Sequence, residues 1–495
     1  MFPFSCPLLL SVASIILAPP TTNPWPSRWR DENFFLKFGL RRFWRFAILA
    51  ALSGEKGGSE KLRTVKKDKE LKMRILCGTI LAAVAVSLSG AASAAPFNVL
   101  DFGAKGDGVA KDTAAIQKAV DACSAAGGGT VEVPPGVYLS GTIYLKSHVD
   151  FCVGPGATIK GSPDREDYNA YDVCPQNGRS ITENASGAHL FMCIEQKNVT
   201  LRGPGTIDGN GAAFMLRPDG KHYERQAIPW RPSQMVYFVE CEDVRVRDIR
   251  LRNPAYWTLF LHGCTHVFVR GVDIRTGRTW HSAVDCYIYQ GDGIDVDCCQ
   301  HVSISDCHVR NSDDGITLRA SGGRLKRPQD TRYVTVNNCT VSSSSCAFRF
   351  GVGNGKISDV TVSNIVIWDS RVALDFCTSW GTNGVSYANM LVDNVAVADC
   401  RWFLRASYHG IKGTDMRGLR FSNIRAKASE NALIWGYPEH PISDVRFVNV
   451  DCNMPIELIN CENCEIVGGT LKSAELSEPE LDDRRKKIAD GYHPN

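Results

Sequence analysis

Acidic residues stand in front of two similar apolar segments near the middle of the chain. The triplet Asp-Gly-Ile begins at Asp292 and again at Asp314, and a further acid, Asp313, precedes the second copy. Three carboxyl groups held within a few ångströms repel one another, which raises at least one pKa and leaves a proton to share. A protonated carboxyl beside an ionised one can act as a general acid with a general base. This chemistry requires the two segments to lie side by side.

The same acids also allow structural interpretations. Asp-Gly is a common turn signal, so an isolated copy is more often structural than catalytic. Asp295 and Asp297 extend the first copy to DGIDVD, which resembles a run of calcium ligands. The loop spacing and terminal Glu of an EF-hand are missing, however. We therefore expect no metal at this site.

A recurring pattern indicates how the two segments are placed. An apolar residue is followed by others two and five positions later, in eight copies that begin at Val244, Val267, Val302, Val334, Val360, Met390, Leu419 and Val445. The step of two is the alternation of a half-buried strand, and the step to position five marks a bend into a second strand. Repetition at this period indicates a solenoid, because one unit cannot bury its own apolar face. Short strands without long helices between them predict an all-β fold, a single-stranded parallel β-helix of about ten coils.

Alignment of the coils brings the acids together. When the copies are aligned on the strand after each turn, Trp257, Asp292, Asp314 and Cys346 fall in one column on successive coils. Asp313 lies one residue away. Insertions at 275–290 and 320–331 lengthen loops on either side of this column, where the walls of a substrate cleft are expected.

The two ends of the predicted solenoid differ. A capping helix is predicted to start near Asp112 and to bury Ala115, Ile116, Ala119, Val120 and Cys123 before a glycine run at 127–129. Such a helix would cover the apolar end of the solenoid. The β-helix domain is expected to span 95–475, and residues 476–495 are predicted to be a charged, solvated tail.

The beginning of the chain resembles a secretory signal that is preceded by other sequence. Residues 73–94 combine a positive start, an apolar core and the small residues Ala92-Ser93-Ala94. Residues 1–72 are therefore interpreted as an over-early start or a separate leader, and the domain as secreted, extracellular or periplasmic. Residues 1–72 carry a net charge of +7. Because the net charge of the whole chain is +3, residues 73–495 carry −4. A mildly acidic body argues against nucleic-acid binding.

The positions of the cysteines match the repeat better than they match a framework of disulfide bonds. Of 19 cysteines, 17 follow Ala94, and Cys307 and Cys339 take an apolar position of the repeat, which predicts small buried hydrophobes. A second predicted row consists of Cys241, Cys264 and Cys299. The pair Cys461 and Cys464 is expected to form a disulfide or to remain as free thiols, because a zinc site would need two more ligands.

Five stretches together resemble glycoside hydrolase family 28, the polygalacturonase and rhamnogalacturonan hydrolase family of the pectate-lyase-like superfamily. They lie at 97–123, 127–149, 198–211, 253–274 and 291–318, and the last is GDGIDVDCCQHVSISDCHVRNSDDGITL. The resemblance extends from about residue 97 to 470. It implies a right-handed parallel β-helix, inverting hydrolysis of a glycosidic bond and no cofactor.

The resemblance assigns roles to the acids. The family's Asn-Thr-Asp motif falls on Gln290-Gly291-Asp292, and its Asp-Asp pair falls on Asp313-Asp314. By resemblance, Asp313 would donate the proton, while Asp292 and Asp314 would hold and deprotonate the attacking water.

Two departures from the family pattern affect the expected substrate. The Gly-His-Gly motif falls on Ser345-Cys346-Ala347, so its histidine is missing, and this Cys-Ala is similar to rhamnogalacturonan hydrolases. The Arg-Ile-Lys that binds a galacturonate carboxylate falls on Ala373-Leu374-Asp375. Charge-assisted pairs to carboxylates are the strong ones, so ordinary homogalacturonan is not the expected substrate.

Further residues are candidates for sugar contacts. Trp257 could face a sugar ring, Gln290 adjoins the first acid, and His409 lies in a polar loop between coils. Arg319 and Arg349 could supply cations to the substrate or be solvated outward residues.

Two other functions remain open: a polysaccharide lyase on the same scaffold, and a non-catalytic glycan-binding β-helix. The missing histidine and basic pair favour the second. The expected partner is a polysaccharide or oligosaccharide bound by a monomer, without nucleic acid and without a membrane after signal cleavage.

Overall fold

The computed structural model describes residues 95–169, 176, 186–214, 230–276, 290–378, 383–408 and 414–490. The chain divides into two units, Met1–Ser93 and Ala94–Asn495, and the described residues belong to the second. The predicted signal sequence and the residues before it lie outside the described part. Among the described helices, none combines the length and apolar character that crossing a membrane requires.

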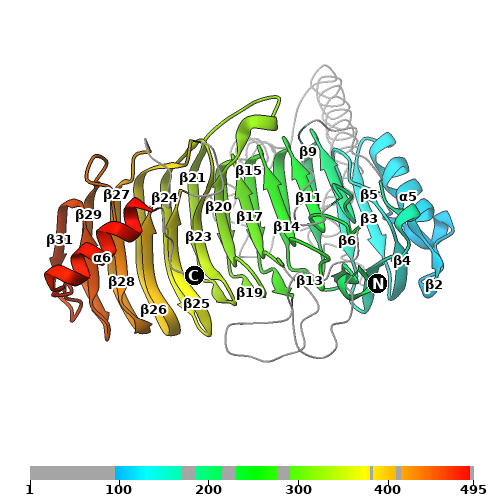
Figure 1. The fold of residues 1–495 in the computed structure, drawn as a ribbon. Coiled ribbons are helices and arrows are strands. Elements are labelled where there is room, and N and C mark those ends of the chain that lie inside the picture. Colours follow the sequence, from blue (N-terminus) through cyan, green and yellow to red (C-terminus); the bar gives the residue numbers. More distant parts are fainter. Residues whose placement is uncertain are drawn as a thin grey trace, which may run out of the picture. The chain divides into compact units, whose positions relative to one another are not determined.

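The described strands pair only in parallel within the coils and form three long ladders, which is the predicted right-handed β-helix (Figure 1). The ladder that follows the acids, which we call the acid sheet, contains β5 (Ile143–Tyr144), β8 (Phe191–Ile194), β11 (Val236–Val239), β14 (Leu259–His262), β17 (Ile294–Asp297), β20 (Ile316–Ala320), β23 (Cys346–Gly353), β25 (Ser370–Cys377), the end of β26 (Ser386–Ser407), β28 (Ala432–Trp435) and β30 (Ile456–Ile459).

The second ladder carries the first part of each repeat. It contains β1 (Phe97–Asn98), β3 (Gly129–Val133), β6 (Val149–Val153), β9 (Lys197–Arg202), β12 (Glu242–Arg247), β15 (Thr265–Arg270), β18 (Gln300–Ser305), β21 (Thr331–Asn337), β24 (Lys356–Ile367), β26, β27 (Arg417–Glu430), β29 (Ile442–Cys452) and β31 (Cys461–Val467).

The third ladder follows the bend of each repeat. It contains β2 (Asp107–Lys111), β4 (Gly136–Ser140), β7 (Ala157–Gly161), β10 (Thr206–Asp208), β13 (Arg250–Arg252), β16 (Asp273–Arg275), β19 (His308–Asn311), β22 (Thr340–Ser343) and the later parts of β24, β26, β27 and β29. Short 3-10 helices lie at η2 (Val99–Phe102), η3 (Arg165–Asp167), η4 (Gly211–Phe214) and η5 (Gly322–Arg324).

The bend of the repeat has a left-handed backbone. The residue four positions after each repeat start has a positive φ, between 52° and 63°, at Asp248, Gly271, Asp306, Asn338, Asn364, Asn394, Asn423 and Asn449. Gly, Asn and Asp adopt this conformation at least cost. Side-chain amides also bond between coils, as from Asn394 to Asn364 at 2.7 Å. The turn residues of the repeat are therefore what bends the chain between ladders.

The core confirms the predicted phase. Every residue at position five of the repeat, including Cys307 and Cys339, is at most 3% exposed. The predicted cysteine row is present too, because the backbone N–H of Cys264 donates to Cys299 Sγ at 3.2 Å. Cys193 extends it, 3.6 Å from Cys241 Sγ. Cysteine thus replaces aliphatic residues in this solenoid.

The front of the solenoid is covered by helix α5 (Thr113–Ala125), as predicted. Ile116, Ala119, Val120 and Cys123 are buried, and Asp112 is the N-cap. The Asp112 side chain does not cap the helix, however. It accepts hydrogen bonds from the N–H groups of Lys105 and Gly106, at 2.7 and 3.0 Å, and so fastens the preceding loop.

The far end differs from the prediction of a charged, solvated tail at 476–495. Residues Glu478–Ala489 form helix α6, which begins with a capping box between Ser477 and Glu480. The capping box satisfies N–H groups of the first turn, and the buried Ile488 gives the helix an apolar contact. Most of its charged side chains are exposed, as predicted, but charge density did not indicate the helix. Nearby, Cys461 and Cys464 form a disulfide, one of the two expected alternatives.

Candidate active site

The acids lie where two turns of the β-helix meet the acid sheet. Ile294 of β17 pairs with Ile316 of β20, which is the register inferred from the repeat. The N–H of Gly293 donates to the carbonyl of Asp314 at 2.9 Å. Asp292 and Asp314 thus occupy equivalent positions on neighbouring coils.

The glycine of each Asp-Gly pair is required by the packing of the coils. A Cβ on Gly293 would lie 2.3 Å from the carbonyl oxygen of Gly315, and a Cβ on Gly315 would lie 2.5 Å from that of Ala347. Real Cβ atoms do not approach this closely. The repeated triplet is therefore a requirement of stacking as well as a carrier of acids.

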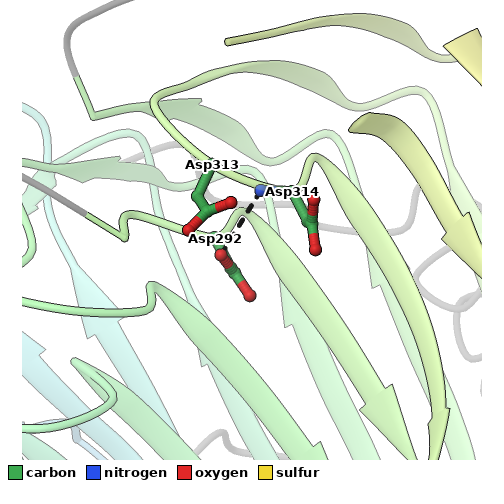
Figure 2. Close-up of side chains that lie close together, drawn as sticks. All are labelled: Asp292, Asp313 and Asp314. Atoms are coloured by element: carbon green, nitrogen blue, oxygen red, sulfur yellow. Dashed lines mark hydrogen bonds between the residues drawn. The ribbon is translucent and has the colours of Figure 1, made fainter. Parts of the chain in front are cut away.

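The three carboxyl groups converge. One oxygen from each of Asp292, Asp313 and Asp314 lies within 4.8 Å of the others. Figure 2 shows the Asp313 carboxyl directed toward that of Asp292, with the Asp314 carboxyl beside them. The N–H of Asp314 donates to Asp292 Oδ1 at 3.3 Å. Asp292 and Asp314 are buried, and Asp313 is partly exposed.

Crowding and burial change the acidity of these groups. Burial, followed by repulsion from Asp314, raises the pKa of Asp313 to about 7, against the opposing effect of Arg349. Burial, followed by repulsion from Asp295 and Asp313, also raises the pKa of Asp292. The cluster therefore holds a carboxylic acid that can be protonated near neutral pH.

An asparagine that the sequence did not single out fixes this turn. The buried Asn311 side chain donates from Nδ2 to the carbonyls of Gly291 at 3.0 Å and Asp313 at 2.9 Å. It also donates to the carbonyl of Asp314 at 2.6 Å. One amide thereby joins the turns that carry all three acids. No short motif marks this residue, because its partners lie on two coils.

The outer face of the acid sheet forms one continuous row across the strands. By register it contains Tyr237, Phe260, Asp295, Thr317, Arg349, Asp375, Arg405, Leu433 and Glu457. We call it the outer row. It is aromatic before the acids and alternates cations with an anion after them.

Arg349 is part of a buried ionic network and is not a solvated residue. Its guanidinium contacts Asp314 Oδ2, and its Nη1 lies 2.7 Å from Asp375 Oδ2. Arg405 Nε approaches the other oxygen of Asp375 at 3.0 Å. Asp375 stands where the family's basic pair was expected, and two arginines from neighbouring coils neutralise it. Arg349 thereby also holds the Asp314 carboxylate in place.

Arg319 is partly buried and lies among charges. Its guanidinium lies 3.6 Å from Asp295 and 3.5 Å from Asp297, and its Cζ lies 4.4 Å from the centre of the Trp257 ring. The Trp257 ring also stacks on Tyr256 and Phe260. Burial raises the pKa of Asp295 to about 8. Arg319 and Trp257 therefore form a packed wall beside Asp292.

Comparison with known proteins identifies the architecture. The model of Glycosyl hydrolases family 28 matches residues 123–470. The chain belongs to glycosyl hydrolases family 28. This confirms the resemblance seen in the sequence and, with it, the enzyme class, a polygalacturonase-like glycoside hydrolase.

Individual family 28 relatives are distant. An exo-poly-alpha-D-galacturonosidase of Dickeya chrysanthemi is 25% identical over 349 residues, which cover 60% of this chain and 55% of that protein. A probable polygalacturonase of Vitis vinifera is 24% identical and covers 72% and 74%. An exopolygalacturonase structure from Thermotoga maritima aligns with a TM-score of 0.60 at 22% identity, covering 75% of this chain and 91% of the other. The last of these supports the fold alone.

The remaining candidates of the family 28 site fall in different places. Gln290 lies in the turn before Asp292, where its Oε1 accepts from Arg231 Nη2 at 2.6 Å. Arg231, which the sequence did not single out, is itself buried and lies 4.6 Å from the centre of the Tyr256 ring. His409 lies outside the described residues, as does most of the 275–290 insertion.

The second insertion, at 320–331, does form a wall. Its residues 321–330 extend back over three coils, where the N–H groups of Lys326 and Arg327 donate to the Glu240 carboxylate at 3.2 and 2.7 Å. Leu325 packs in an apolar cluster with Tyr237 and Phe260. This loop borders the outer face of the acid sheet, as expected from its place in the repeat (Figure 1).

Proposed function

We propose that this protein hydrolyses a glycosidic bond in a pectic polysaccharide, with Asp313 as proton donor and Asp292 and Asp314 as holders of the attacking water. The observation that carries the proposal is the convergence of three carboxyl groups within 4.8 Å on adjacent coils. The same atoms could also ligate a cation, but the proposed reaction uses none.

The roles follow from the surroundings of each acid. Asp313 has a pKa near 7, so a large share of it is protonated under mildly acidic conditions and can deliver a proton to the departing oxygen. Asp314 is ion-paired with Arg349, which orients its carboxylate. The base draws a proton from water while the water oxygen attacks the anomeric carbon and the bond to the leaving sugar breaks.

Inversion at the anomeric carbon is part of the proposal and rests on family membership. Carboxyl groups of inverting glycosidases are usually about 6.5–9.5 Å apart. The closest oxygens here lie within 4.8 Å, which is nearer than that range. Proton NMR of the first-formed product distinguishes the outcomes, because inversion yields the opposite anomer before mutarotation.

Ordinary homogalacturonan is not the substrate we propose. The two arginines after the acids, Arg349 and Arg405, are already paired with carboxylates. Arg371 makes no ion pair with a described carboxylate, and its Nη2 donates only to Ser345 Oγ, at 3.2 Å. Within the part of the chain that the structure describes, Arg371 is the one available cation beside Asp313, which suits a glycan with isolated acidic sugars better than a uniform polyuronate.

Reducing-end release from a panel of pectic and non-pectic glycans tests the proposal. We expect release without a rise in near-ultraviolet absorbance, and faster release from mixed pectic glycans than from homogalacturonan. An unsaturated, ultraviolet-absorbing product would show a lyase instead. Tight binding without release from any glycan would favour the non-catalytic alternative.

We also propose that the protein is secreted, because residues 73–94 have the pattern of a signal sequence. Expression of the gene and N-terminal sequencing of the exported protein tests this. A mature chain that begins at Ala95 is expected, and a chain retained in the cell with residues 73–94 intact would contradict it.

A further inference from the structure

The bend that joins the third ladder to the acid sheet is accessible to solvent on the C-terminal side of the acids. The accessible side chains lie on three successive coils: Ser312 and Asp313, then Ser344, then Trp368 and Arg371. The outer row beyond the acids, by contrast, is buried. A molecule that touches Asp313 therefore meets accessible side chains along the bend and not along the outer row.

The register relates the arginine of this bend to the proposed proton donor. Through β23, Ile316 of β20 is in register with Leu374 of β25. Three residues before these, Asp313 and Arg371 therefore occupy the same position on coils two apart. Ser345 occupies this position on the coil between them, which we call the middle coil.

The Arg371 side chain extends back toward Asp313. Its Nη2 donates to Ser345 Oγ at 3.2 Å, which places the guanidinium beside the middle coil. Burial raises the pKa of Asp313, but the positive charge of Arg371 and a hydrogen bond from the Ser345 side chain lower it, so both groups lie close to the carboxyl. Nε of Arg371 is buried without a partner, whereas Nη1 is accessible and donates to no described atom. Nη1 is therefore available to an anion.

Trp368 lies at the other end of the same bend. By register it takes the position of Arg310 two coils further on, with Ser342 between them. Two strand spacings separate the main chains by about 10 Å. Arg310 Cζ nevertheless lies 5.8 Å from the centre of the Trp368 ring, because the short serine side chain does not hold the two apart. The ring keeps an accessible surface, since Trp368 is 38% exposed.

Arg371 and Asp292 lie on opposite sides of Asp313. Asp292 belongs to the coil before it, and the Arg371 guanidinium lies beside the coil after it. In the proposed reaction Asp292 holds the attacking water and Asp313 protonates the departing oxygen. The sugar that is attacked is then on the side of Asp292, and the departing sugar is on the side of Arg371.

We propose that the bend is the binding site of the departing sugar, with Arg371 Nη1 bound to a carboxylate of that sugar and Trp368 packed against its ring. Arg371 is then a residue that determines specificity, and the selected glycan has an acidic sugar directly after the cleaved bond. A charge-assisted hydrogen bond is the strong kind of polar contact, and a Trp ring offers a large apolar surface. This inference rests on the proposed function, since it names the sugar that the same site releases.

Two forms of one substrate test the inference on the full chain: a mixed pectic glycan of acidic and neutral sugars, and the same glycan with its carboxyl groups reduced to alcohols. Arg371→Gln should raise KM about tenfold or more for the acidic form and should change it little for the reduced form, because only the acidic form loses a charge-assisted bond. Arg425→Gln, at an exposed position of β27, is the control and should leave both KM values unchanged. The assays are run on the plateau of the pH profile, so that a changed pKa of Asp313 does not contribute.

Trp368→Ala tests the other half of the site. It should raise KM for both forms by a similar factor, because packing against a ring does not depend on charge. Phe268→Ala, which removes an aromatic side chain that is 48% exposed on the second ladder, is its control. Circular dichroism verifies that each variant is folded.

Three results would overturn the inference. They are an equal effect of Arg371→Gln on the two forms, which would mean that Arg371 acts only through Asp313, an unchanged KM in Trp368→Ala, and equal kcat/KM of the wild type for both forms. Absence of hydrolysis of either form by the wild type would instead contradict the proposed function.

Discussion

The acids obtain their properties from neighbours on other coils. Burial and repulsion from Asp314 raise the pKa of Asp313 to about 7, whereas the positive charges of Arg349 and Arg371 lower it. The stacking of the coils brings both arginines near Asp313, whereas Asp314 is simply the next residue in the chain. The spacing of Asp292, Asp313 and Asp314 was predictable from the repeat. The contacts of Asn311 and Arg231 were not, because no periodic pattern encodes them.

Arg371 provides a prediction at this scale. Replacing it by glutamine removes a positive charge that lowers the pKa of Asp313, so the proton donor should remain protonated to higher pH. The alkaline limb of the kcat/KM profile should move upward, by up to about one pH unit. Arg425→Gln, on an exposed position of β27, serves as the control and should leave the limb unchanged. A downward shift in the Arg371→Gln variant would be incompatible with Asp313 as the acid.

The elements that recur in every coil could be predicted from the sequence, whereas elements that occur once could be predicted less well. The eight repeat copies predicted the strand phase and the coil order, because each copy must bury the same positions. The capping helix was predicted separately, from its N-cap, its apolar face and the glycine run after it. Loop 321–330 and helix α6 were not predicted in detail. Both are fixed by long-range contacts, such as those of Glu240 with Arg327 and of Glu457 with Arg484, which only the completed solenoid brings together.

The wall loop provides a prediction for one element. Glu240→Ala leaves the N–H groups of Lys326 and Arg327 without their acceptor, which should cost about 1–3 kcal/mol in local stability. Trypsin should then cleave the folded protein faster after Lys326, whereas the bond after Arg327 precedes Pro328 and resists trypsin. Glu242→Ala is the control, since Glu242 forms an exposed ion pair with Lys197, and exposed pairs contribute little to stability. Equal cleavage rates for both variants would show that Glu240 does not hold the loop.

The molecule as a whole carries several buried carboxyl groups in its acid sheet, and these groups should make its free energy of unfolding depend on pH. The pKa values of Asp313 and Asp295 rise from 3.8 to about 7 and about 8 on folding. The folded state therefore binds more protons than the unfolded chain up to about pH 8, so stability falls as pH rises. Below about pH 6.5, His262 opposes this trend, because burial lowers its pKa.

The clearest window is therefore pH 6.5 to 8.5. Calorimetry should give a Tm that decreases across this window, and Asp295→Asn should flatten the decrease because it removes one of the carboxyl groups with a raised pKa. A Tm that rises over the same range in the wild type would contradict the raised pKa values.

The central claim is that the three converging acids perform hydrolysis. Asp313→Asn tests it most directly, because the amide is nearly isosteric but cannot donate the carboxyl proton. On the glycan that the wild type degrades fastest, reducing-end release at the optimum pH should fall about 10²–10⁴-fold, with an unchanged circular dichroism spectrum. Activity within a few-fold of the wild type would show that Asp313 is not the proton donor.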